Sequence, residues 1–433
     1  MTQNSSLPKQ GVSLSSERPV LPAVGEKPDT ESRQAPRDLA LDWATRPGFG
    51  LTPQGVKRIY LEAEAGYPQR QVDMFHDLIE NDGHLRGLID ARINAVAGKG
   101  WVLQPGGTDS ASIEGAQALE ELLRTANVHE LLWHQLECNF YGWAHSEIDW
   151  DFKDGLFYPA WFNSVPHRRF VFPDGIPRLL TAENYVSGEE LTPGRWVVSR
   201  ARGSSISRAG LMRTAAWFAL FKRTSIRDWV VAAEKYGIPF VLGKLSNTAL
   251  PKTRAALESV LKKLGQDGFG LVDDEVEIEI VNIAQRTGDG GLLANLVSLC
   301  NAELSKTLTG ATLTADAGGT GSWALGKVHS GVRFDLIQSD AAMVAEVMRR
   351  CIGEPFMRFN GFPGQAPILK SQIAQDIDQQ TRMKIQVQAA KLGLPLSMSQ
   401  MYEDHALRKP LNDEDRLVVT PGVANEKEEK ADD

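Results

Sequence analysis

The sequence predicts an α+β protein with two or three domains. Long stretches with apolar residues at helical spacing alternate with short runs that Gly and Pro bound, as short strands are. In Val276–Val281, apolar residues and Glu alternate strictly, as they do in a half-buried strand. With 433 residues, of which 42% are hydrophobic, the chain is long enough to bury a sizeable core.

Both ends of the chain differ in composition from the rest. Residues 1–45 are rich in Ser, Pro, Gln and Glu and have no hydrophobic period, so we expect a flexible N-terminal arm. Residues 412–433 hold eight acidic and three basic residues and carry most of the net charge of −8. We therefore expect a disordered acidic tail.

The block 46–203 predicts an α+β domain. Residues 72–97 read as two helices separated by Asn81-Asp82-Gly83, with Asp82 as the N-cap of the second helix. Further along the block we expect a strand at 101–104, helices at 112–126 and 129–141, and strands at 146–152, 156–162, 170–172 and 196–198.

A long helix, 205–236 within the segment 204–237, is predicted next. It is apolar nearly all round, which indicates a buried helix, and we expect it to pack against neighbouring subunits. Its four arginines fall within an arc of roughly 140° at 100° per residue, which leaves one basic face. These residues are Arg208, Arg213, Arg223 and Arg227.

The segment 238–283 predicts a small βαββ unit. We expect strands at 240–245, 269–272 and 276–281, with a helix at 251–264 that begins with Pro and ends before Gly. The last strand is acidic on its outward side, through Asp273, Asp274, Glu275, Glu277 and Glu279. Such a row of carboxylates is typical of a solvated face, and a cation site is the alternative.

Helices return after this unit. We expect a helix at 292–308 within 284–308, and then a loop rich in Gly and Thr at 309–331. The candidate functional residues of the loop are Gly318, Gly319, Gly321, Trp323, Gly326 and Lys327. A long helix from 332, broken around 353–355, is predicted within 332–370, followed by a helical C-terminal region at 371–411 that begins with a helix at 371–392.

Two motifs resemble those of enzymes, and each has a defect. Gly321–Lys327 matches the GxxxxGK of a phosphate-binding loop, but Val328 stands where Ser or Thr would hold Mg²⁺. His129 and His134 are five residues apart, so on a helix they diverge by about 140° and cannot share a metal. We therefore expect no catalytic residues, no metal and no cofactor.

The sequence also lacks the features of several other protein classes. The sequence has no secretory signal and no apolar run of about eighteen residues. We therefore expect a protein that does not associate with a membrane and stays in the cytoplasm where it is made. Three widely spaced cysteines without a CxxC pair indicate buried free thiols. The negative net charge is untypical of a tight nucleic-acid binder.

Five groups of residues, in order along the chain, resemble the portal protein family of Mu-like transposable tailed bacteriophages. They are Asp82-Gly-His-Leu-Arg-Gly-Leu-Ile-Asp-Ala-Arg92 with Ala95-Val-Ala-Gly98, Trp101 and Pro105; Tyr141-Gly-Trp-Ala with Glu147-Ile-Asp-Trp150; Pro166-His-Arg-Arg-Phe170 with Asp174-Gly175; Phe221-Lys222, Asp228-Trp229, Tyr236-Gly-Ile-Pro239 and Gly243-Lys244; and Gly310, Gly321-Ser322 and Gly326. The matches extend from about residue 50 to 410.

The resemblance implies a portal fold of wing, stem, clip and crown. The wing would be 46–203 with the long helix and connection at 332–370, the stem helices 204–237 and 284–308, and the clip 238–283. A tunnel loop at 309–331 would touch DNA, and 371–411 would be crown-like.

The resemblance also implies a homo-oligomeric ring, a dodecamer, at the capsid portal vertex of the virion. Double-stranded DNA would pass through without sequence-specific contacts during packaging and ejection. The major capsid protein, the terminase large subunit and head–tail adaptor proteins would be the partners. Lys327 and the four arginines are the candidate DNA-facing residues.

Two alternatives remain open at this point. One is a nucleotide-dependent DNA-processing enzyme that uses Gly321–Lys327. The other is a non-conducting head scaffold or minor structural protein. Nucleotide binding would favour the first, and irregular assemblies instead of closed rings would favour the second.

Overall fold

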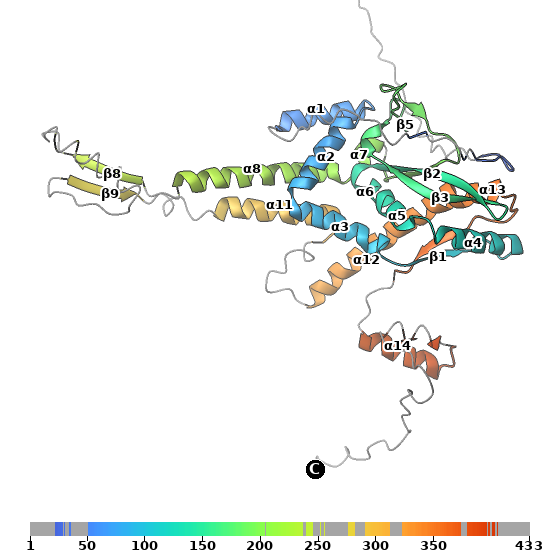
Figure 1. Cartoon of the computed structure of the whole chain (residues 1–433). Helices are drawn as coiled ribbons and strands as arrows, with labels where there is room; N and C mark the ends of the chain where they lie inside the picture. Colours follow the sequence, from blue (N-terminus) through green and yellow to red (C-terminus); the bar gives the residue numbers. More distant parts are fainter. Residues whose placement is uncertain are drawn as a thin grey trace, which may run out of the picture. The chain divides into compact units, whose positions relative to one another are not determined.

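The computed structural model describes residues 22–28, 30, 34–35, 51–203, 205–236, 240–245, 252, 255, 276–281, 291–311, 323–373, 379–395, 397–398, 401–402 and 405. It divides the chain into two compact units, Met1–Ile373 and Ala374–Asp433. The described elements are helices and small antiparallel sheets, so the predicted α+β class is confirmed (Figure 1).

Three helices open the first unit: α1 (Pro53–Glu64), α2 (Gln69–Asn81) and α3 (Gly83–Ala97). The predicted cap at Asp82 is confirmed, because its Oδ1 accepts from the backbone N–H groups of His84 and Leu85 at 3.0 and 3.1 Å. The carboxylate satisfies N–H groups that have no partner inside the helix.

The main sheet is three-stranded and antiparallel, in the order β3 (Leu156–Val165), β2 (Trp143–Lys153) and β7 (Trp196–Arg200). Three helices precede it: α4 (Ser110–Leu123), α5 (Val128–Leu136) and α6 (Cys138–Tyr141). Helix α5 packs against β2 and β3, as Figure 1 shows.

A smaller sheet follows the turn η1 (His167–Arg169). It is formed by β4 (Phe170–Val171), β5 (Arg178–Leu179) and β6 (Glu189–Glu190). The hydrophobic core is shared between the helices and the sheets. Its largest fully buried side chains include Phe75, Phe140, Trp143, Phe162, Phe170 and Phe356.

The helix predicted at 205–236 is broken in the structure. It consists of α7 (Ile206–Ala209) and α8 (Met212–Tyr236), with Gly210 between them. Gly210 lies directly against the backbone of α6, where a Cβ atom would collide with the Phe140 carbonyl oxygen. The prediction of a single helix was wrong because this close approach does not show in the local apolar pattern.

Part of the predicted βαββ unit lies within the described residues. Strands β8 (Phe240–Leu245) and β9 (Val276–Val281) pair antiparallel, with Glu277 opposite Lys244 and Glu279 opposite Leu242. Of the predicted helix at 251–264, Lys252 and Ala255 are described, and both are helical. The predicted strand at 269–272 lies outside the described residues.

The last helices of the first unit are α11 (Gly291–Thr309), α12 (Trp323–Met348) and α13 (Glu354–Phe359). The predicted loop at 309–331 is therefore too long, because residues 323–331 belong to α12. A glycine inside a helix costs about 1 kcal/mol, and packing of the other turns outweighs the cost of Gly326 and Gly331. The predicted break at 353–355 is instead a π-helical turn, Arg349–Gly353, that joins α12 to α13.

The helix predicted from residue 371 starts later than expected. Residues Ile368–Ser371 form strand β10, which pairs antiparallel with β1 (Trp101–Gln104). The pairing joins segments far apart in the sequence, so a local helical pattern could not show it. The second unit holds helix α14 (Gln379–Lys391).

Candidate functional site: the paired helices α8 and α11

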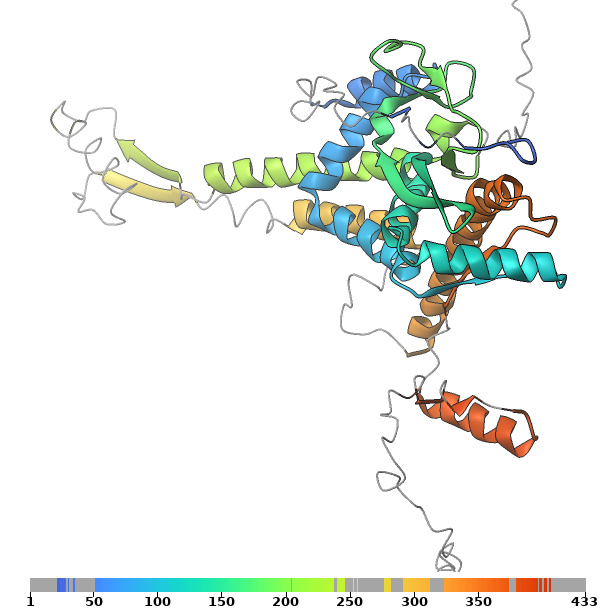
Figure 2. The ribbon, with the colours of Figure 1, turned by 45° about the vertical axis from the view of Figure 1, so that its right-hand side comes forward.

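Helices α8 and α11 pack along one another and run in opposite directions (Figures 1 and 2). Small and aliphatic side chains are buried where α8 begins and where α11 ends. They are Ala215, Ala216, Ala219 and Leu220 on α8, and Leu304 and Leu308 on α11. Small residues allow the two backbones to approach closely, which fits a stable helix pair.

Helix α3 anchors α8 through a buried ion pair. Lys222 Nζ lies 2.7 Å from Asp82 Oδ1, and both side chains are 11% exposed. This oxygen is the one that caps α3. The carboxylate therefore starts one helix and holds the other, while the neighbouring pair Arg223–Asp77, at 2.6 Å, ties α8 to α2. These groups border a cavity of about 300 Å³ between α2, α3 and α8.

The same helix, α3, also holds α11 and α12. Arg92 on α3 forms two bonds to Asp340 on α12, with Nε–Oδ2 at 2.8 Å and Nη2–Oδ1 at 3.0 Å. Its Nη1 donates to the carbonyl oxygen of Leu308, near the end of α11, at 2.6 Å. His84 Nε2 lies 3.1 Å from the hydroxyl of Ser305 on α11. Polar side chains of α3 thus hold the three helices α8, α11 and α12.

The structure brings three of the four predicted arginines to acids of α1 and α2. Arg213 pairs with Glu64 and lies 4.1 Å from the ring centroid of Tyr60, and burial raises the pKa of the Tyr60 hydroxyl. Arg208 lies 3.8 Å from Glu64, and Arg223 pairs with Asp77.

Arg227 differs from the other three arginines. Its side chain is 71% exposed, and it pairs with its sequence neighbour Asp228. The four arginines therefore do not share one environment. A role for any of them in contacting DNA stays a prediction.

The other sequence-predicted residues lie outside this helix pair. Trp323, Gly326 and Lys327 are on α12, and Glu277 and Glu279 are on β9. Residues Gly318, Gly319, Gly321, Asp273, Asp274 and Glu275 lie outside the described residues.

Apolar side chains remain exposed along the helix pair in the single chain. On α8 they are Phe221, Ile226, Trp229, Val230 and Val231, and on α11 they are Leu296 and Leu299. We call these seven residues the apolar stripe. On α8 they lie on more than one face, since Ile226 also borders the cavity between α2, α3 and α8. Large exposed apolar side chains concentrated on one helix pair often mark an interface with another protein.

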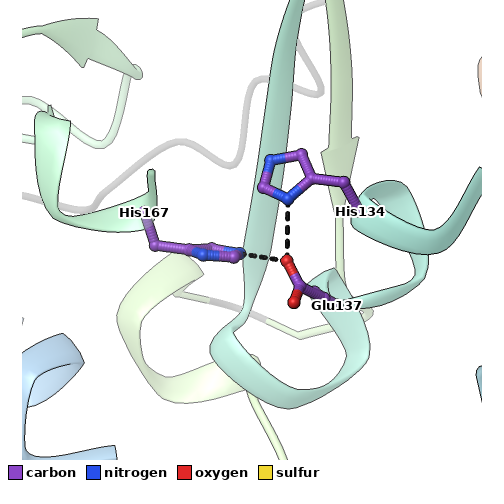
Figure 3. Close-up of side chains that lie close together, drawn as sticks. All are labelled: His134, Glu137 and His167. Carbon is purple, nitrogen blue, oxygen red and sulfur yellow. Dashed lines mark hydrogen bonds and ion pairs between the residues drawn. The ribbon is translucent and has the colours of Figure 1, made fainter. Parts of the chain in front are cut away.

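A second group of polar residues lies away from the helix pair. In the part of the chain that the structure describes, one group of His, Cys, Asp and Glu side chains could hold a metal ion: His134, Glu137 and His167 (Figure 3). His134 and His167 are buried and Glu137 is half-buried. His129, the other histidine of the rejected zinc motif, is exposed on α5 and does not belong to this group.

Sequence reasoning missed the residues that hold the site together. The pairs Lys222–Asp82 and Arg92–Asp340 are 140 and 248 residues apart in the sequence. The one signal in the sequence that could have indicated these ion pairs was a charged residue on an otherwise apolar helix face, as at Lys222 and Arg92. No helix among the described residues has the length and apolar character needed to cross a membrane.

Comparison with known proteins assigns the chain to a family. A family model described as the portal protein of Mu bacteriophage matches residues 72–407. The chain is 28% identical over 349 residues to the Mu-like prophage FluMu protein gp29 of Haemophilus influenzae, covering 77% of this chain and 65% of that protein. It is 25% identical over 397 residues to the portal protein of Escherichia phage Mu, covering 89% of this chain and 76% of that protein.

Solved structures were compared as well. A phage portal protein of the HK97 family from Corynebacterium diphtheriae has a TM-score of 0.40 at 12% identity, covering 73% of this chain and 95% of that one. A chain in the neck of a native gene transfer agent particle has a TM-score of 0.48 at 12% identity, covering 81% of this chain and 94% of that one. The family match, which spans most of the chain, decides the assignment: this chain belongs to the family of portal proteins of Mu bacteriophage.

Proposed function

We propose that the chain is a subunit of a closed ring at the capsid vertex, and that the ring forms the channel for DNA packaging and ejection. The observation that carries this proposal is the apolar stripe on a helix pair that α3 anchors in place. Membership of the portal family supports it, and the relative from phage Mu is named a portal protein.

A second copy of the chain is the partner that fits the apolar stripe. The stripe lies on two antiparallel helices. If a neighbouring copy covers the stripe of every subunit, the same contact must repeat around an axis. Repetition that closes gives a ring, and we infer a dodecamer from the family resemblance. The major capsid protein, terminase large subunit and head–tail adaptor proteins would bind its outer surfaces.

Double-stranded DNA would pass through the ring without sequence-specific contacts. A channel that lets DNA slide needs few fixed cations, because each phosphate contact adds affinity and slows movement. All four arginines lie near an acid, but the side chains of Arg208 and Arg227 are 62% and 71% exposed, whereas those of Arg213 and Arg223 are 18% and 34% exposed. Among the candidate contacts, Lys327 on α12 is the one predicted from the loop region.

The rival nucleotide-binding function has less support. In a phosphate-binding loop, Gly-rich backbone precedes the helix and the Gly-Lys pair stands at its first turn. Here Trp323 already begins α12, so Gly326 and Lys327 lie inside the helix. We therefore infer that the ring subunit binds no nucleotide and that catalysis belongs to a separate motor protein.

Electron microscopy of the purified full-length chain tests the proposal. We expect closed rings with an axial hole wide enough for a DNA duplex. Replacing Trp229, 40% exposed on the apolar stripe, with Glu should prevent ring closure, because it places a charge in the subunit interface. Replacing Tyr185, which is 72% exposed and lies off the helix pair, with Glu should leave the rings intact.

The outcomes separate the candidate functions. Monomers or irregular assemblies of the unmodified chain would overturn the ring and favour a scaffold or minor structural protein. Rings that bind ATP, with binding lost in Lys327→Ala, would favour the enzyme. Circular dichroism of both Glu variants checks that each one folds.

A further inference from the structure

Three ligand-type side chains meet where α5, α6 and η1 come together (Figure 3). His134 lies in the last turn of α5, Glu137 directly follows that helix, and His167 begins η1. Glu137 Oε2 lies 2.7 Å from His134 Nδ1 and 3.9 Å from His167 Nε2. We propose that these residues, the His–Glu cluster, bind a divalent transition-metal ion, with Zn²⁺ as the ion that best fits the donors.

The hydrogen bonds of His134 leave a lone pair facing the carboxylate. Its Nε2 lies 3.2 Å from the carbonyl oxygen of His145, and a carbonyl can only accept, so Nε2 must carry a hydrogen. In a neutral imidazole the other nitrogen then has a lone pair, and here Nδ1 points at Glu137 Oε2. Two electron-rich atoms at this distance require a positive species between them.

His167 also directs the lone pair of a ring nitrogen toward Glu137. It is hydrogen-bonded to the backbone of Trp143, while its buried Nε2 has no hydrogen-bond partner. By elimination the backbone bond uses Nδ1, so the lone pair of Nε2 faces the same carboxylate.

A proton and a metal ion would give bonding partners to different numbers of these three ligand atoms. A second proton on His134 would form an ion pair with Glu137 but leave His167 Nε2 unpaired, and an unpaired buried polar group costs about 1–3 kcal/mol. A metal ion bonds to all three atoms at once. We therefore favour the metal over a simple ion pair.

The geometry requires small adjustments for zinc. All three ligand atoms lie within 4.8 Å of one another. Zinc bonds of about 2.0–2.2 Å at tetrahedral angles place ligand atoms about 3.4 Å apart. The two separations from Glu137 Oε2, 2.7 and 3.9 Å, would therefore change by less than about 1 Å, and the separation between the two histidine nitrogens by about 1.4 Å at most. Neutral imidazole and carboxylate are zinc ligands, and three of them leave the fourth position to water.

The surroundings of the two histidines also fit metal ligands. Imidazoles that bind metals usually donate their other N–H to a backbone carbonyl or a carboxylate, which fixes the ring orientation and the tautomer. The His145 carbonyl does this for His134, and the backbone of Trp143 does it for His167. Tyr141, stacked on His167 with ring centroids 4.1 Å apart, holds that ring in place. A bound ion would then tie the end of α5 to η1 across the sheet edge.

Metal analysis of the full-length chain tests the proposal. The protein is given Zn²⁺, desalted, and its metal content is measured by mass spectrometry. We expect one zinc per chain, lost in His167→Gln and in Glu137→Gln. His129→Gln is the matched control, because His129 is an exposed histidine of the same helix, and it should retain the zinc.

X-ray absorption at the zinc edge of the unmodified chain supplies a second readout that does not depend on the variants folding. We expect two imidazole rings with oxygen ligands at about 2.0–2.2 Å. Absence of stoichiometric zinc, zinc retained by both cluster variants, or sulfur in the ligand shell would each overturn the proposal. Ring formation is measured separately, so its failure leaves these outcomes unchanged.

Discussion

The ion pair between Arg92 and Asp340 offers the sharpest test of how the helices are held. The side chains are 10% and 6% exposed, and Asp340 accepts both hydrogen bonds of the fork that Arg92 presents. Asp340→Ala leaves the guanidinium buried and short of its counter-charge. Breaking a buried pair in this way costs about 3–5 kcal/mol, and we expect the low end, because Arg92 keeps its bond to the Leu308 carbonyl.

The same helix supplies a matched control. Arg86 and Asp90 on α3 form an ion pair four residues apart, with side chains 58% and 38% exposed. Asp90→Ala should cost about 0.3–0.5 kcal/mol, as exposed helix pairs do. The double variant Arg92→Met/Asp340→Leu should recover most of the loss, because an apolar pair needs no buried counter-charge.

Guanidinium unfolding followed by tryptophan fluorescence measures all four proteins. The protein concentration must be equal throughout, since subunit association adds a concentration-dependent contribution to stability. If Asp340→Ala costs no more than Asp90→Ala, the Arg92–Asp340 pair does not stabilise the fold and the reasoning is refuted.

Three further predictions follow from other contacts. Gly142→Ala should lower thermal stability by clearly more than Gly155→Ala: both glycines have positive φ, but a Cβ at Gly142 meets the carbonyl that begins α7, whereas one at Gly155 meets nothing within 4 Å; equal losses would contradict this. Cys351 is buried, which raises the pKa of its thiol, so iodoacetamide should alkylate it far more slowly in the native chain than in guanidinium, as peptide mass spectrometry can measure. Asp82→Ala should increase hydrogen exchange at the start of α3 more than Lys222→Ala does, because it removes the helix cap as well as the ion pair; the reverse order would argue against the double role of Asp82.

Features that depend on a few neighbouring residues were readable from the sequence. The cap at Asp82 needs a side-chain oxygen two or three residues before free N–H groups, and the sequence shows that arrangement directly. The alternating Val276–Val281 strand is also local, and the structure contains it as β9.

Features set by distant backbone were not readable. Gly210 breaks the long helix because α6 lies against it, and β10 exists because β1 offers it a partner. The His–Glu cluster shows the same limit. The sequence analysis considered His134 only with His129, whereas the structure places it beside His167, 33 residues further along, in a turn whose sequence does not show a metal-ligand spacing.

The position of α3 has a mechanical consequence for the proposed ring. A force on α8 or α11 would reach the rest of the first unit partly through side chains of α3, at Asp82, His84 and Arg92, and partly through the pairs that tie α8 to α1 and α2. Their contacts are spaced along α3 and connect to three different helices, so tension is shared among several short bonds instead of stretching one chain connection.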